Sequence, residues 1–199
     1  RGNVVFGNAE RNDFRPVTSK SKIHAGDTVR TSDGASVNLA LMPGAFVHLS
    51  GNSEIKIEDL RLTKDGNETA GGVLDRCASI RLDRGKIVSL FSHSSTSASE
   101  FVVATGQVTL RPDSDCLFSI WTDRAMTRVT CGRGEVSAPA DAQSQMKIAA
   151  GCFFQWPTAS KEPIVAITDA DAQMDVKTAL DVELELLDQA ADWQNRRVF

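Results

Sequence analysis

The sequence lacks a long hydrophobic run. Hydrophobic residues make up 41% of the 199, but no stretch approaches the roughly 18 to 20 consecutive apolar residues of a membrane-spanning helix. The charged fraction is 24%, which is typical of a soluble globular chain. The chain starts at Arg1 rather than methionine and has no apolar signal-peptide core, as expected of a processed protein or a fragment. We therefore expect a folded chain without a membrane span of its own.

Motifs for catalysis are also missing. The sequence contains neither the G-x-S-x-G turn of serine hydrolases nor a G-x-x-x-x-G-K-[ST] phosphate loop. Ser92, His93 and Asp83 have no spacing that indicates a catalytic triad. Asp113 and Asp115 flank a turn and are too few to form a cation site by themselves, because a hard cation needs about six oxygen ligands. We predict that the protein is not an enzyme and has no catalytic residue, metal or cofactor.

A clear excess of one charge sign over the other occurs only in the C-terminal segment. The net charge is −4, and residues 169–199 carry eight acids and three bases, a net of −5. Residues 1–168 carry 18 acids and 19 bases, a net of +1. Proteins that bind nucleic acid show a basic patch or stripe. The near-neutral body therefore gives no reason to expect a nucleic-acid partner.

Cysteines are few, and none of them is spaced as a metal or redox pair. Cys77, Cys116, Cys131 and Cys152 form no C-x-x-C motif and lie near no histidine at zinc-ligand spacing. One interpretation is four buried thiols; the other is one disulfide in an oxidising compartment. Cys116 and Cys131 are the candidate disulfide pair, because they flank a segment typical of a hairpin with its turn near residues 123–124.

Alternating hydrophobicity dominates residues 23–156. Val37, Leu39 and Leu41 share one face of a strand, and Ile55 and Ile57 share another. Glycine turns feed directly into such strands at 25–29, 43–47, 84–88, 105–108, 133–136 and 150–154. We predict a mainly β fold over 1–160: an irregular, solenoid-like β-roll or a meander of short strands. Polar loops are expected at 64–72 and 92–99.

The C-terminal segment changes to a helical period. No Gly or Pro occurs from 168 to 197, and Thr168 is placed to cap a helix over 168–199. One apolar stripe consists of Ala172, Val176, Ala179, Leu180, Leu184, Leu187 and Ala191. We expect this stripe to pack on the β-rich body.

A second apolar row on the same helix is formed by Val182, Leu186 and Trp193. The residues leave two arrangements open: the helix is wedged between two surfaces of its own domain, or one row docks on another chain. We predict that Val182, Leu186 and Trp193 bind another protein, because tryptophan is enriched at interaction hot spots.

The order of the turns and strands resembles the FecR domain family. The family's "L-x-x-G-D-x-v-x-T" opening is similar to residues 23–31, and its "v-x-L-x-x-G-x-v" strand is similar to 80–87. Further matching segments are 36–41, 43–49, 51–57, 101–105 and 134–136. The resemblance covers residues 3–156. It departs at 111–118, where the family often has "R-G-T-x-F".

The resemblance implies an extracytoplasmic domain that acts in signalling or scaffolding at the cell envelope through protein contact. Its partner would be another protein chain, either an envelope protein or a copy of itself. The best-known members join this domain to a cytoplasmic anti-sigma segment, which this sequence does not contain. The alternative function is a self-assembling structural subunit of an envelope or extracellular assembly.

Overall fold

The fold is given by a computed structural model, which describes residues 2–64, 73–93, 98–112, 114–139, 144–157 and 162–195. The predicted loops at 64–72 and 92–99 lie largely outside these residues. The first strands are β1 (Val4–Asn8), β2 (Asp13–Pro16), β3 (Thr28–Thr31), β4 (Val37–Met42), β5 (Ala45–Leu49), β6 (Glu54–Lys64), β7 (Val73–Phe91) and β8 (Ala98–Ala104). The later strands are β9 (Thr109–Leu110), β10 (Cys116–Thr122), β11 (Thr127–Arg133), β12 (Glu135–Pro139), β13 (Gln145–Ala149), β14 (Cys152–Trp156) and β15 (Ile164–Val165). The mainly β prediction is confirmed.

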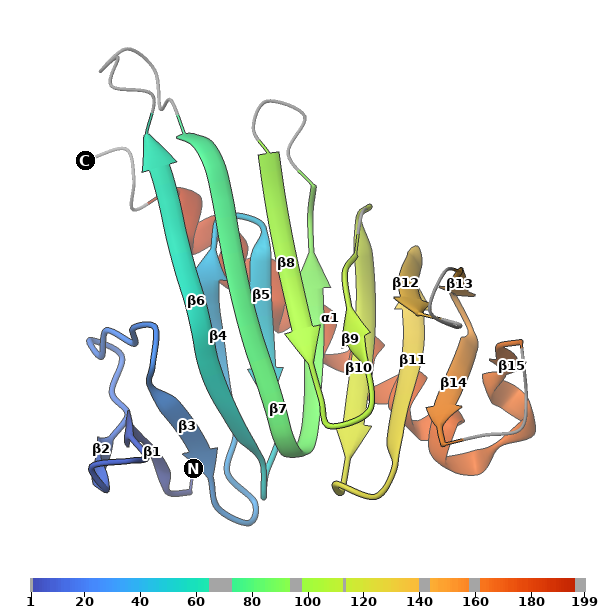
Figure 1. The fold of residues 1–199 in the computed structure, drawn as a ribbon, viewed down its shortest axis with the longest axis horizontal. Helices are drawn as coiled ribbons and strands as arrows, with labels where there is room; N and C mark the ends of the chain where they lie inside the picture. Colours follow the sequence, from blue (N-terminus) through green and yellow to red (C-terminus); the bar gives the residue numbers. More distant parts are fainter. Residues whose placement is uncertain are drawn as a thin grey trace.

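Most strands belong to two sheets that share the long strand β7. The first sheet, sheet A, has the order β2-β1-β3-β6-β7-β8-β9. The second, sheet B, has the order β4-β5-β7-β10-β11-β14-β15. In Figure 1, β6, β7 and β8 lie in front of β4 and β5. Strands β12 and β13 form a separate small sheet.

Strand β7 passes from one sheet to the other at Gly85. Residues up to Arg84 pair with β6, whereas Gly85 and the residues after it pair with β10. Gly85 has a φ of 90°, and a Cβ there would lie 2.5 Å from the Cα of Ser53. Glycine adopts this conformation at no steric cost and leaves room for the crossing backbone. The glycine turn at 84–88 is therefore a bend inside one strand.

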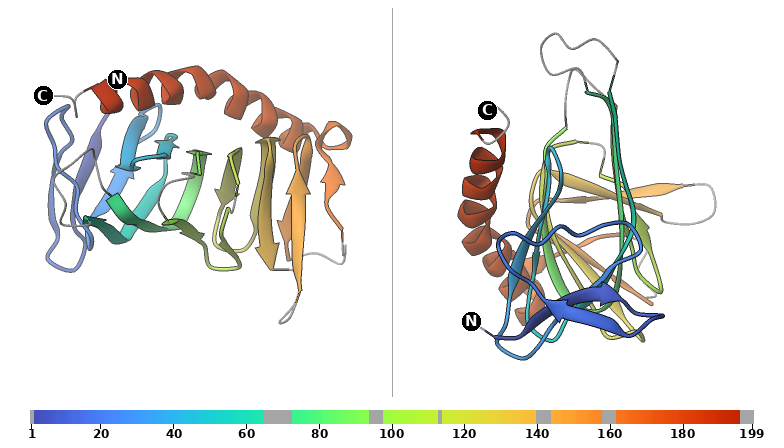
Figure 2. Two further views of the ribbon diagram at one scale, coloured as in Figure 1. Left: turned by 90° about the horizontal axis from the view of Figure 1, so that it is seen from above. Right: turned by 90° about the vertical axis from the view of Figure 1, so that its left-hand side faces the viewer.

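A helix adds a third layer outside sheet B. After a single 3-10 turn at Ala166–Thr168, helix α1 spans Ala170–Asn195. It crosses the outer face of sheet B and contacts β4, β5, β7, β10 and β11 (Figure 2). Both faces of sheet B are thus buried, which explains the continuous apolar runs in β5, β7 and β10.

The predicted C-terminal helix is confirmed, but its cap lies one residue later than expected. The N–H of Ala172 donates to Oδ1 of Asp169 at 2.8 Å, whereas the Thr168 hydroxyl donates to the Val165 carbonyl. Within the described part of the chain, no helix combines the length and the apolar character needed to cross a membrane.

Candidate interaction surfaces

Helix α1 packs on sheet B through an apolar cluster. Ala179 and Leu186 are fully buried, and they pack against four side chains on the outer face of sheet B. Those side chains are Phe46, Val88, Leu90 and Leu117. Val182 is half-buried against the same cluster. The face of α1 that contains Leu186 therefore belongs to the interior of the protein.

The prediction that Val182 and Leu186 are left free for another chain is wrong. Leu186 is 0% exposed, and both residues contact the body of their own chain. The side chain of Trp193 lies outside the described residues. Helical periodicity finds two apolar rows, but it does not say which row faces the sheet.

A buried ionic cluster also lies between α1 and sheet B. Asp175 is 4% exposed and lies between two cations from sheet B. One Asp175 carboxylate oxygen is 2.7 Å from Nε of Arg128, and the other is 2.8 Å from Nζ of Lys86. Arg128 also lies over the Trp121 ring and reaches Asp171 at 3.4 Å. The only sequence signal for this cluster was an acid placed between Ala172 and Ala179 on an apolar stripe.

The opposite side of α1 exposes a row of three leucines, hereafter the leucine row: Leu180, Leu184 and Leu187. Their exposed fractions are 45%, 71% and 41%. Their spacing of four and then three residues aligns them along one side of the helix. The sequence prediction that these residues pack on the body is therefore wrong, although Ala172 and Ala179 from the same stripe are buried.

Acidic side chains lie beside the leucine row on α1. Asp181, Glu185 and Asp188 are all exposed. Among the described residues, no ion pair includes Asp181 or Asp188. An exposed apolar row with polar side chains at its border is a composition found at surfaces that contact other proteins.

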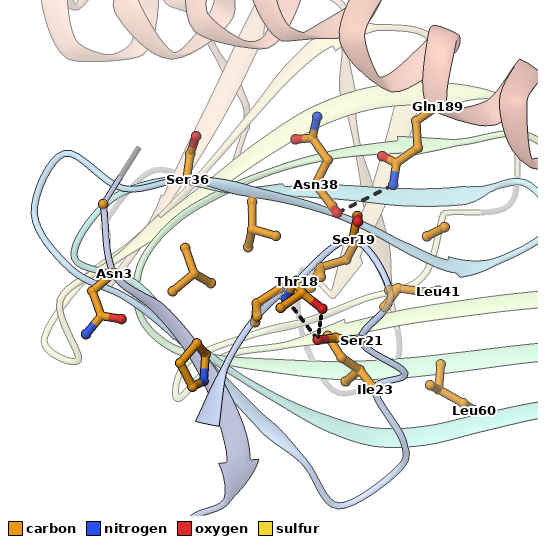
Figure 3. A pocket seen from close by; sticks show the side chains of 17 residues that line it. Asn3, Thr18, Ser19, Ser21, Ile23, Ser36, Asn38, Leu41, Leu60 and Gln189 are labelled. Atoms are coloured by element: carbon orange, nitrogen blue, oxygen red, sulfur yellow. Dashed lines mark hydrogen bonds between the residues drawn. The ribbon is translucent and has the colours of Figure 1, made fainter. Parts of the chain in front are cut away.

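A groove lies beside strand β4, at the edge of sheet B. Its volume is about 680 Å³, and β4 forms one wall. The segment 16–23 forms the other wall, with Thr18, Ser19 and Ser21 on it (Figure 3). Gln189 of α1 closes one side, and its Nε2 donates to the Asn38 carbonyl at 3.4 Å. None of the described residues that line this groove is charged.

The side chains considered for catalysis are not assembled into a site. Asp83 pairs with Arg81 at 2.9 Å. Ser92 directly follows the C-terminal half of β7, which runs from Gly85 to Phe91. The seven residues of that half, at about 3.3 Å each, separate Asp83 from Ser92 by roughly 20 Å. The His93 N–H donates to Asp115, and Asp113 lies outside the described residues. In the part of the chain that the structure describes, no three His, Cys, Asp or Glu side chains are grouped to hold a metal.

The candidate disulfide between Cys116 and Cys131 is absent, because all four cysteines are free thiols. The predicted hairpin is present: β10 and β11 are antiparallel neighbours, and the Asp123 N–H donates to the Met126 carbonyl in their turn. The register of this hairpin places Cys131 opposite Phe118 rather than Cys116. Burial raises the pKa of the Cys131 thiol to about 12, so it stays protonated.

Comparison with known proteins identifies one family. The model of the family described as "FecR protein" matches residues 27–137. No curated protein matches the chain.

Two crystal structures of a candidate anti-sigma factor from Parabacteroides distasonis ATCC 8503 are similar in fold, each with 14% identity and a TM-score of 0.47. In both cases the similarity covers 69% of this chain and 57% of that protein. At this level the similarity carries no information on function.

Proposed function

Because the chain belongs to the FecR family, which it matches over residues 27–137, we propose that it is a non-enzymatic protein-binding module in a signalling pathway of the cell envelope. The family membership supports a regulatory role in signalling. The module acts by contact with a partner protein rather than by chemistry on a substrate. It works outside the cytoplasm, as the FecR resemblance implies.

The observation that carries the proposal is the leucine row on α1. A leucine that is 71% exposed at position 184 keeps apolar area in water, and burying that area stabilises a complex by about 25 cal/mol per Å². The row lies on a regular helix held rigidly by the Asp175 cluster and by Leu186. A rigid apolar row loses little conformational entropy on binding.

The alternative, a self-assembling subunit, is less compatible with the same surface. Two copies that met through their leucine rows would bring Asp181, Glu185 and Asp188 of one chain near the same acids of the other. Like charges at close range oppose such a contact. A partner with basic side chains beside its own apolar row fits better.

The test compares Leu184→Asp with deletion of the gene in the source organism. We expect both changes to alter the same set of transcripts, because loss of the contact removes the regulatory signal. Gln173→Leu, at another exposed position of α1, is the control and leaves those transcripts unchanged. Circular dichroism of the purified variants checks that the fold is kept.

A deletion that leaves the transcripts unchanged would contradict the signalling role. A Leu184→Asp variant that behaves as the wild type, while the deletion does not, would exclude the leucine row as the contact surface. Protease accessibility of the protein in intact and permeabilised cells tests the location: we expect cleavage without permeabilisation of the inner membrane.

A further inference from the structure

Cys131 and Cys152 lie on the neighbouring antiparallel strands β11 and β14. The last pair of the ladder between these strands joins Thr130 to Phe153. Continued by one residue, the same register places Cys131 opposite Cys152. The Gly151 N–H donates to the Cys131 carbonyl at 2.8 Å, so the two backbones are still in contact at this point.

The side chains of both cysteines lie on the same face of sheet B. Successive side chains of a strand point to opposite faces. Phe153 packs against Ala166 on the outer face, whereas Cys131 belongs to the apolar cluster between the two sheets and Cys152 packs against that cluster. Opposed residues of antiparallel strands have Cα atoms about 4.5 to 5.5 Å apart, and a disulfide spans roughly 4.4 to 6.8 Å between Cα atoms. The backbone therefore already has the spacing of a disulfide.

The titration of Cys131 supports the proximity of the two thiols. Burial raises the pKa of the Cys131 thiol, the backbone at Arg133 lowers it, and a negative charge on Cys152 raises it again. In the reduced protein, the Cys131 Sγ atom lies 3.4 Å from the carbonyl oxygens of Arg133 and Gly134. Rotation about the Cα–Cβ bond of Cys131 redirects this sulfur to another staggered position without moving the backbone.

The other two cysteines do not occupy such opposed positions. Cys116 lies opposite Phe91 of β7, and the register of the β10–β11 hairpin offsets it from Cys131. Cys77 lies opposite Arg61 in sheet A, on the other side of the bend in β7. The strand register thus singles out one pair among the four thiols.

We propose that Cys131 and Cys152 form a redox site, in which an oxidant that is itself a disulfide joins them and fastens β14 to β11. Cys152 is half-buried and is the thiol that the oxidant reaches, whereas Cys131 is 0% exposed. The Cys152 thiolate attacks the oxidant and expels one thiol. Cys131 then loses its proton, and its sulfur attacks Cys152 and expels the second thiol. Two protein thiols and one disulfide thus become one protein disulfide and two free thiols.

The bridge would act where helix α1 begins. Phe153, the neighbour of Cys152, packs with Ala166 and Ala172 at the start of the helix. Beyond β14, sheet B has only the two-residue strand β15, so this end of the sheet has little pairing of its own. Closing the loop between residues 131 and 152 also restricts the unfolded chain, which stabilises the folded one. This inference goes beyond the proposed protein binding and does not depend on it.

The test treats the full 199-residue chain with oxidised glutathione, blocks the remaining thiols with iodoacetamide and maps the tryptic peptides by mass spectrometry. We expect the peptides 129–133 and 148–161 to be joined by a disulfide. We also expect the midpoint of thermal unfolding to lie about 5 to 10 °C above that of the chain kept in a reductant. Cys131→Ser and Cys152→Ser lose both effects, whereas the control Cys77→Ser keeps both.

A bridge between Cys131 and Cys116, a glutathione adduct on Cys152 without an internal bridge, or four thiols that all remain open to iodoacetamide would overturn the proposal. A bridge that forms only in urea would also overturn it, because the folded register would then not bring the thiols together. A bridge without a rise in the unfolding midpoint would overturn the fastening of β14. The mapping uses the wild-type chain, so it does not depend on whether the serine variants fold. Leu184→Asp should form the same bridge, so a failure of the leucine row and a failure of this site are distinguishable.

Discussion

At the scale of single residues, Asp175 is the central group of the interface between α1 and sheet B, where it lies between Arg128 and Lys86. Charges taken out of water repay their dehydration only when opposite charges are close and well oriented. Both carboxylate oxygens of Asp175 have such a partner within 2.8 Å. The cluster therefore favours the rotation of α1 that places Asp175 against the sheet.

Replacing Asp175 by asparagine should strongly destabilise the protein. Asp175→Asn leaves Lys86 without its counter-charge in the interface and Arg128 with only the exposed Asp171, and we expect the free energy of unfolding to fall by about 3 kcal/mol. Urea denaturation followed by circular dichroism measures the change. Asp171→Asn is the matched control, since the Asp171 side chain is 81% exposed, and it should cost less than about 1 kcal/mol. Equal losses for the two variants would contradict the role given to Asp175.

His48 makes the stability of the protein sensitive to acid. Burial lowers the pKa of His48 below 6.5, against a raising effect of Glu185, and Lys86 lowers it further. The folded protein thus binds this proton more weakly than the unfolded chain does, so stability falls as the pH drops below about 6.5. We expect His48→Gln to lose less stability than the wild type between pH 7 and pH 5, measured by denaturation at each pH. Parallel pH profiles of the two proteins would contradict this prediction.

At the scale of elements, β7 joins the two sheets because it bends at one glycine. The N-terminal part of β7 pairs with β6 and β8 in sheet A, and the part from Gly85 on pairs with β5 and β10 in sheet B. Ser53 lies inside this bend, and its Oγ accepts from the Lys86 N–H at 2.9 Å. The bend thus places the C-terminal part of β7 in sheet B, on which α1 packs.

Gly85→Ala should disturb both sheets. The added Cβ would meet Ser53, and alanine at a φ of 90° is strained, so we expect a loss of at least about 2 kcal/mol in the free energy of unfolding. Thermal and urea denaturation measure it. Gly106→Ala is the control: no atom lies within 4 Å of its added Cβ, and the change should stay within about 0.5 kcal/mol. A Gly85→Ala protein as stable as Gly106→Ala would show that the bend does not need glycine.

At the scale of the whole molecule, the protein has three layers and two interfaces. One apolar cluster lies between the sheets, and a smaller one lies between sheet B and α1. Helix α1 is therefore part of the folded body on its inner side. Its outer side carries the leucine row, and its end closes the groove beside β4 through Gln189.

Removal of α1 should expose the outer face of sheet B. A chain that ends at residue 165 leaves Phe46, Val88, Leu90 and Leu117 without cover, and we expect it to bind a hydrophobic dye and to aggregate. Dye fluorescence and light scattering measure these effects. The control is the triple variant Leu180→Gln, Leu184→Gln and Leu187→Gln, which changes only the outer side and should stay soluble. A soluble truncated chain would mean that α1 is dispensable for the body.

The local pattern of the sequence by itself determined the mainly β body, the glycine turns and the long C-terminal helix. Each depends on neighbours within a few residues: period 2 in strands, period 3.6 in the helix, and glycine at turns. The FecR resemblance could also be read from the order of these elements, and the family match over 27–137 confirms it.

The tertiary structure alone decided which side of α1 faces the sheet and where the free surfaces lie. Leu186 and Leu184 are only two positions apart, yet one is fully buried and the other is 71% exposed. Which of the two is buried is decided by residues distant in sequence: Leu186 packs against apolar side chains of sheet B, and Asp175 meets Arg128 and Lys86 there. The groove has the same origin, since segment 16–23, β4 and Gln189 meet only in the folded chain. The helical period shows which residues share a face of α1. Which face packs on sheet B depends on strands that are far apart in the sequence and pair only in the folded chain.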